Sequence, residues 1–371
     1  MKKLILTFLC ILLLMPSAAA YDSVLYQQQL DAAGGNTLRG ALPAESARYL
    51  EQKTPSVDLE IGESFASLLQ TVLQDHRTLL REGLHSLTRV LFVVVLCSCA
   101  AGIRTTTGDS LSTSTINMAG ALGITGVLLG DLHGMMGLCS QTLEQVSTFS
   151  KTMLPVMAAA ISMSGAPTAA TVLQGATMFA FDLLVRFITI VLVPAVCAYI
   201  AMITVNTALD NDALGKLAIF VKWMTTGSLK LLLTVFIAYI TLSGSVGGSI
   251  DGVALKTARF AVSGGVPVVG GIISDATETI LSGAVLLKNT LGIFGLLCIA
   301  AICIVPFLKV GMNYLLFKAG AAVLSPVCPK NLSGLVSGIS DSFGLLLGML
   351  GTCSAILFFE LVFSISLVHV S

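Results

Sequence analysis

The sequence predicts an all-α fold: a polytopic membrane helix bundle with an internal two-fold repeat and broken or re-entrant helices. Composition is the first reason, since 55% of the 371 residues are hydrophobic and only 11% are charged. Soluble domains average about 25% charged residues. A chain with so few charges has too little polar surface to face water on all sides, so lipid must cover much of it. Long uncharged windows and an internal sequence correspondence are the other two reasons.

Residues 1–20 have the pattern of a cleavable signal peptide. Lys2 and Lys3 form its charged start, an apolar run follows, and Ala18–Ala20 fit the rule of small residues at a cleavage site. The run of about 12 residues is shorter than the roughly 20 that a membrane span needs. We therefore expect the N-terminus to be exported. The alternative is a first helix that is retained.

Residues 21–88 are the long polar region of the chain and are expected to form an extracytoplasmic helical segment. They include nine acidic residues and five Lys or Arg, so their net charge is −4. Apolar residues recur at helical spacing over 60–87, which predicts an amphipathic helix leading into the first span. The segment is either a stalk or a docking surface. Its export fits a cytoplasmic position for the connection that contains Lys216, Lys222 and Lys230.

Residues 89–371 are predicted to form a multi-span membrane domain. Charge-free windows indicate about six to eight spans, because roughly 20 apolar residues cross the hydrocarbon core. One window, 152–181, is interrupted by Pro155, Gly165 and Pro167, which predicts a re-entrant hairpin or two short helices. The windows are 90–103, 110–130, 152–181, 187–209, 231–250, 289–308 and 342–359.

An offset of 112 residues aligns the chain with itself without a gap. It places Pro155 on Pro267 and Pro194 on Pro306, so the two prolines are 39 residues apart in both halves. Self-similarity at a fixed offset is the signature of an internal duplication. The predicted repeats cover about 153–250 and 265–362.

Broken helices are predicted near the start of each repeat. A broken helix exposes N–H and C=O groups that lipid cannot satisfy, so it survives only against protein or a water-filled cavity. Transporters with internal repeats place their substrate path at such breaks. The alternative is close helix packing through small residues. The candidate positions are Pro155, Pro167, Gly264, Gly265, Pro267, Gly270 and Gly271.

Charged and polar residues near membrane depth are the second group of candidates, because burying them in lipid is costly. Asp182 and Arg186 are four residues apart and are expected to pair on one helical turn. Asp275 and Glu278 would share a helix face. The alternative for each is a structural ion pair or a side chain that reaches the interface. The candidates are Asp182, Arg186, Lys256, Arg259, Asp275, Glu278, Lys288, Asn289 and Lys318, while Asp341 and Glu360 stand alone in the sequence.

Catalytic and metal-binding patterns are missing from the sequence. The four histidines are scattered, and the nine cysteines include no CxxC pair. A formal net charge of zero gives no basic surface for nucleic acid. We expect a protein that is not an enzyme, with no cofactor, whose surroundings are the lipid bilayer.

Several motifs between residues 256 and 322 resemble the stage III sporulation protein AE family. They read KTARFAVS at 256–263, VPVVGG at 266–271, SDATET at 274–279, LKN at 287–289 and LFKAGAA at 316–322. The layout of signal peptide, polar segment and multi-span body is also similar. The sequence departs from the family where Gly265 and Val266 precede Pro267, since a bulkier pair is expected there.

The resemblance implies a non-enzymatic subunit of a sporulation-specific channel or secretion-like complex that links mother cell and forespore and is required for forespore development. It implies a place in the outer forespore membrane, on the mother-cell side. It also implies other stage III sporulation membrane proteins and a forespore-side protein as partners. The alternative is a stand-alone secondary transporter or permease, with its path at the interface of the two repeats.

Overall fold

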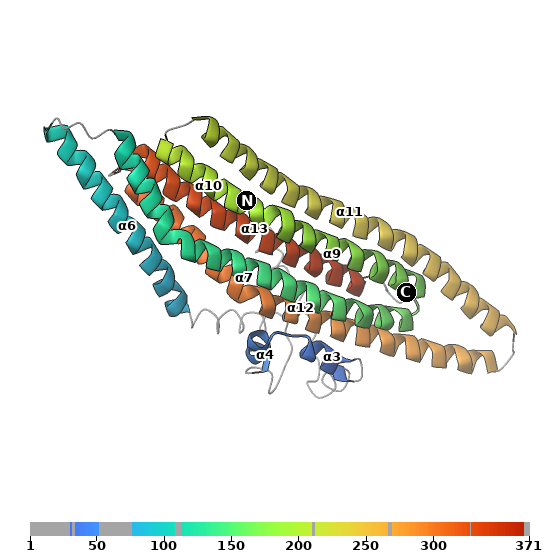
Figure 1. Cartoon of the computed structure of the whole chain (residues 1–371). Helices are drawn as coiled ribbons and strands as arrows, with labels where there is room; N and C mark the ends of the chain where they lie inside the picture. The colour runs from blue at the N-terminus through green and yellow to red at the C-terminus, as the bar shows by residue number, and fades with distance from the viewer. Residues whose placement is uncertain are drawn as a thin grey trace.

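The computed structural model describes residues 30–31, 34–51, 76–107, 113–209, 212–265, 269–326 and 328–366 (Figure 1). Across these ranges the structure is helical and contains no strand. Six of the helices are long and apolar enough to cross a membrane, which confirms the predicted all-α, multi-span fold. The signal peptide predicted at 1–20 lies outside the described residues.

The long helices pack side by side into one elongated bundle (Figure 1). Proline shapes one of them locally: just before Pro194, the Val193 N–H bonds to the Ile188 carbonyl, five residues back, in a π-helical turn. In chain order the elements are α3 (Gly35–Gly40), α4 (Ala44–Glu51), α6 (His76–Thr107), α7 (Thr113–Met163), α8 (Pro167–Val172), the π-turn η1 (Leu173–Thr177), α9 (Met178–Phe187), the π-turn η2 (Ile188–Leu192), α10 (Val193–Leu209), α11 (Asp212–Gly265), α12 (Val269–Leu324) and α13 (Lys330–Ser366).

α12 and α13 form the centre of the bundle. Their most apolar stretches are 72% and 78% buried inside the protein, against 22–33% for the other four membrane-capable helices. A helix that is hydrophobic all round is expected in such a position. The 56 residues of α12 span about 84 Å at 1.5 Å per residue. Since the hydrocarbon core is about 30 Å thick, the bundle must extend beyond the membrane.

The interrupted window at 152–181 is the end of one long helix and the start of the next. α7 runs through Pro155 and ends at Met163, Gly165 adopts a left-handed φ of 92°, and Pro167 begins α8. A proline at the first helical position loses nothing, because its N–H would be unsatisfied there anyway. The predicted break therefore lies at Gly165–Pro167, and the prediction of a break at Pro155 is wrong.

The second predicted break coincides with a helix boundary. α11 ends at Gly264–Gly265 and α12 begins at Val269, so Gly270 and Gly271 lie in its first turn. Pro267 falls between them, outside the described residues. Its counterpart under the 112-residue offset, Pro155, lies inside α7. The duplication stays a prediction.

The polar N-terminal region packs on the bundle where the structure describes it. α3 contacts α7, and α4 contacts α12 (Figure 1). Leu30 and Leu38 are fully buried, and the Arg39 guanidinium lies 5.9 Å from the centre of the Phe294 ring. This part of the chain therefore packs against the bundle, and the choice between a stalk and a docking surface stays a prediction.

Candidate functional site

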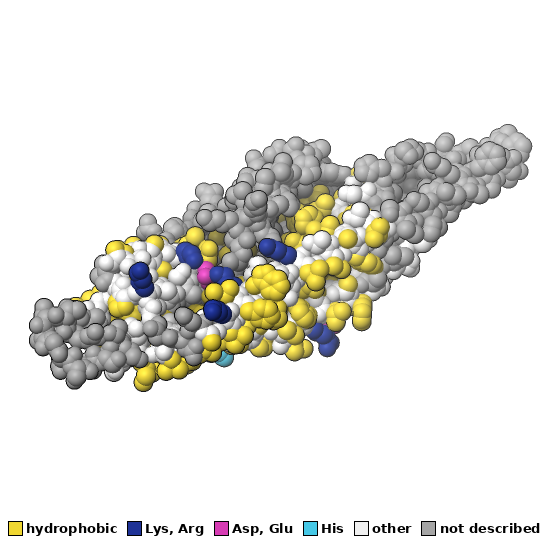
Figure 2. All heavy atoms as spheres, turned by 90° about the horizontal axis from the view of Figure 1, so that it is seen from above, with side chains coloured by type: hydrophobic (Ala, Val, Ile, Leu, Met, Phe, Trp, Pro, Cys, Tyr) yellow, Lys and Arg dark blue, Asp and Glu magenta, His cyan; other side chains and the backbone are white. Residues whose placement is uncertain are grey.

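Three helices bring charged side chains together near one end of the bundle. The Lys222 Nζ of α11 lies 2.6 Å from Asp341 Oδ2 of α13, and the Lys318 Nζ of α12 lies 3.0 Å from Asp341 Oδ1. Lys318 also donates to Ser337 Oγ at 3.3 Å. Viewed from above, basic side chains flank acidic surface among hydrophobic and other neutral atoms of the described residues (Figure 2). Lys318 and Asp341, isolated in the sequence, are thus partners.

A cavity of about 400 Å³ opens beside this cluster, between α10, α11 and α13. Its polar lining includes Tyr199, Asn206, Asn331, Ser337 and the charged residues Lys222, Lys330 and Asp341. Close packing of α13 on α10 bounds it, because an added Cβ at Gly338 would lie 2.7 Å from Ile203 Cδ1. The cavity is therefore both polar and built by tightly packed helices.

The pair Arg89–Asp131, 4.0 Å apart, joins α6 to α7. It lies at nearly the same position along the bundle axis as the cluster around Asp341. Leu87, two residues before Arg89, packs against Gly320, two residues after Lys318. The two charged groups therefore lie within about two helical turns of each other along the bundle. We call these residues together the first charged level: Arg89, Asp131, Lys222, Lys318 and Asp341.

A second charged level lies farther along the bundle. Asp182 of α9 accepts from the Lys151 Nζ of α7 at 2.7 Å and from Arg186 Nε at 2.8 Å. The sequence predicted the local pair with Arg186 but not the partner on α7. Met153 and Leu361 both pack on Gly295, which places Lys151 and Glu360 at similar heights.

Glu360 is fully buried on α13. Neither carboxyl oxygen has a hydrogen bond of good geometry with the described residues. The Thr177 hydroxyl, at the end of η1, interacts with this carboxyl. π-Turns occur often at functional sites. Glu360 is therefore the least satisfied charged group in the described part of the bundle.

Lys288 is also fully buried, but its ammonium donates to the Ile365 carbonyl at 2.7 Å. Asn289 beside it is half-buried. The remaining predicted side chains lie outside the described residues, although their backbone is helical: Lys256, Arg259, Asp275 and Glu278.

The two levels are about one bilayer apart. From Asp341 to Glu360 along α13, and from Asp131 to Lys151 along α7, the helical rise amounts to about 28–30 Å. The hydrocarbon core of a membrane is about 30 Å thick. Residues 342–359 between the α13 carboxylates carry no charge. The spacing of these groups along α7 and α13 is therefore similar to the thickness of one hydrocarbon core, and the Lys309–Glu82 pair, 3.0 Å apart, joins α12 to α6 between the two levels.

Between the levels, the outer surfaces of α7 and α11 differ in polarity. α7 exposes a stripe that we call the α7 polar stripe, whose members recur every three or four residues and so share one face. α11 exposes a row of apolar side chains, Leu231 (64%), Val235 (58%) and Leu242 (68%), at similar distances from the first level, and beside this row it exposes Lys230, Thr234 and Thr241. Helical spacing could have revealed the stripe, but a search for charge-free windows passes over it. Its residues are His133, Gly137, Gln141, Glu144, Thr148 and Lys151.

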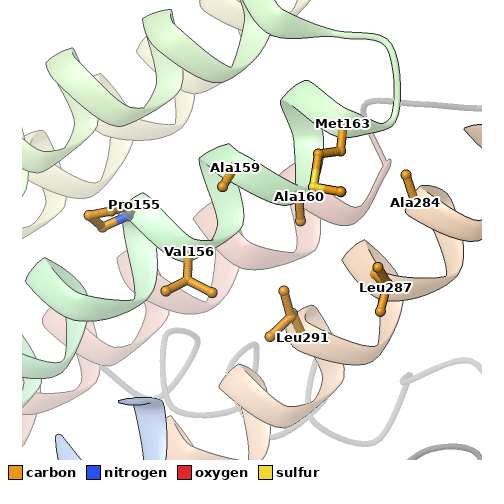
Figure 3. Close-up of a pocket in the computed structure, with 8 residues that line it drawn as sticks. All are labelled: Pro155, Val156, Ala159, Ala160, Met163, Ala284, Leu287 and Leu291. Carbon is orange, nitrogen blue, oxygen red and sulfur yellow. The ribbon is translucent and has the colours of Figure 1, made fainter. Parts of the chain in front are cut away.

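A second cavity, of about 360 Å³, separates the end of α7 from α12 (Figure 3). Pro155, Val156 and Met163 line it from α7, and Leu287 and Leu291 line it from α12. None of these lining side chains has a polar group that could donate a hydrogen bond to an ion or coordinate it. The neighbourhood of Pro155 therefore has the chemistry of helix packing, not of a polar path.

Metal chemistry finds no support among the residues that the structure describes. They contain no group of three or more His, Cys, Asp or Glu placed to hold a metal ion. The eight cysteines beyond the predicted signal peptide are free thiols, and five of them are buried. They behave as small hydrophobic residues.

Six membrane-capable helices with charges paired between them define a multi-pass integral membrane protein. The chain belongs to the stage III sporulation protein AE family, whose family model matches residues 48–368. It is 26% identical over 233 residues to the stage III sporulation protein AE of Bacillus subtilis (strain 168). That alignment covers 63% of this chain and 58% of the relative, less than two thirds of the relative's length. No solved structure matches the chain. The resemblance found in the motifs is confirmed.

Proposed function

We propose that this protein is a non-enzymatic subunit of a sporulation-specific channel or secretion-like complex that links mother cell and forespore. It acts in the outer forespore membrane, on the mother-cell side, and is required for forespore development. Its partners are other stage III sporulation membrane proteins and a forespore-side protein. Family membership supports the role in sporulation, and the six apolar helices support the role in a membrane.

The α7 polar stripe is the observation that supports a role for this membrane subunit in forming a conduit. Lipid cannot hydrogen-bond to Gln141 or Glu144, so such a face needs water or protein against it. The row of α11 side chains formed by Leu231, Val235 and Leu242 at the same depth needs neither. A subunit with one lipid-facing side and one polar side suits a place in the wall of a water-filled path.

Cysteine accessibility tests this arrangement. With exposed Cys99 and Cys197 replaced by serine, Gln141→Cys is expected to react with a membrane-impermeant maleimide in membranes of sporulating cells. Leu231→Cys, which lies about as far from the first charged level on α11, is expected to react at least about tenfold more slowly, because lipid excludes the reagent. Equal rates at the two positions would contradict the proposal, since they would place this whole stretch in water or in lipid.

A stand-alone transporter or permease is the second candidate function. The observation that favours it is Glu360, because embedded carboxyls often serve in proton or ion relays. This function predicts that the purified chain alone moves protons or solutes across liposome membranes, and that Glu360→Gln abolishes the flux. A complex subunit predicts no flux until its partners are added.

A further inference from the structure

The cavity between α10, α11 and α13 contains more positive than negative charge. Lys222 and Lys330 line it together with a single carboxylate, Asp341. Lys318 donates to the other oxygen of that carboxylate. Lys318 does not itself line the cavity, so its lining contains two ammonium groups and one carboxylate, a formal surplus of one positive charge. Surplus positive charge at the mouth of a cavity with low-dielectric walls attracts an anion.

Neutral groups around the same cavity are suited to an anion. Tyr199 and Ser337 contribute hydroxyl groups, and Asn206 and Asn331 contribute side-chain amides. Lys330 is also the first residue of α13, a helix of 37 residues. The positive end of its dipole favours negative charge there. The lysines, the neutral donors and the helix end thus converge on one space.

We propose that this cavity binds an oxyanion of the phosphate class, supplied by an anionic phospholipid headgroup or by a soluble phosphate. A volume of about 400 Å³ accommodates such a group. Phosphate oxygens accept from ammonium and amide donors together, which is the set that the cavity offers. The proposal does not rest on the channel function, because any membrane protein with this cavity would bind the anion.

Two variants remove the site in different ways without breaking the contacts of Asp341. Lys330→Gln removes a charge from an exposed side chain and leaves both lysine–aspartate pairs intact. Gly334→Leu fills the cavity instead, since Gly334 lines it and an added Cβ there meets nothing within 4 Å. Lys230→Gln is the matched control, because Lys230 is an exposed lysine of α11 that does not line the cavity.

The test uses the purified full chain in detergent, with inorganic phosphate, phosphatidylglycerol and phosphatidylcholine as probes. Thermal unfolding measures stabilisation, and native mass spectrometry measures retained lipid. Phosphatidylglycerol is expected to raise the Tm and to be retained, while phosphatidylcholine is not. Lys330→Gln is expected to weaken the apparent affinity about tenfold, Gly334→Leu to abolish binding, and Lys230→Gln to leave it unchanged.

The probes also identify the source of the anion. Stabilisation by inorganic phosphate that both cavity variants remove supports the site with a soluble ligand, whereas a response to phosphatidylglycerol alone supports it with a lipid. A response to neither probe overturns the proposal. An equal loss of binding in Lys230→Gln overturns it as well, because the attraction would then be general and not located in the cavity.

Discussion

Replacing Asp341 with leucine is expected to lower the free energy of unfolding by about 2–3 kcal/mol, because it leaves two lysines without their shared carboxylate. Removing one partner of a fully buried pair costs about 3–5 kcal/mol. The smaller value follows because the Lys222 and Lys318 side chains are 33% and 46% exposed and can turn toward water or headgroups. Thermal unfolding in detergent, followed by reaction of a fluorescent maleimide with the buried thiols of Cys139, Cys298, Cys303 and Cys353, measures the loss.

The double variant Lys222→Met with Asp341→Leu is the control for this prediction. It leaves the half-exposed Lys318 as the remaining charge of the cluster, so about half or more of the lost stability is expected to return. Lys318→Met alone keeps the 2.6 Å pair and should have a small effect. A double variant as unstable as Asp341→Leu alone would show that Asp341 is needed for something other than these lysines.

The class of fold could be predicted because it follows from composition and from apolar stretches, which are properties of single segments. The lengths of the helices could not. α7 continues through Asp131, His133, Glu144 and Lys151, since polar residues on one face do not break a helix. A search for charge-free windows ends a span at the first such residue. It therefore split one helix of 51 residues into two windows.

The ion pairs show which contacts could be predicted from neighbouring residues in the sequence and which depend on how distant helices pack. Asp182 and Arg186 could be paired from the sequence because four residues bring side chains onto one helix face. The Lys222–Asp341 contact joins residues 119 positions apart. It depends on the register in which α11 packs against α13, where an added Cβ at Gly348 would lie 3.4 Å from Leu229 Cδ1 of α11. Hydropathy carries no information on that register.

Replacing Glu360 with methionine is expected to raise the free energy of unfolding by about 1–4 kcal/mol, because it removes a fully buried carboxyl without a good hydrogen bond. Methionine has a similar volume and adapts to irregular space, so the packing of α13 should survive. Val362→Met, two residues away and 37% exposed, is the matched control and should change stability little. The measurement is again the Tm of the purified protein in detergent.

Glu360→Met is also expected to impair sporulation, which is measured by counting heat-resistant spores. A residue that costs stability is retained when it serves function, so stability and activity should move in opposite directions. Glu360→Gln separates the two roles of the carboxyl, since it keeps the polar shape beside Thr177 but cannot carry a negative charge. Loss of spores with a raised Tm in both variants would assign the function to the ionisable group. A lowered Tm in Glu360→Met would instead show that the carboxyl stabilises the junction between η1 and α13, and its place in a conduit would lose its support.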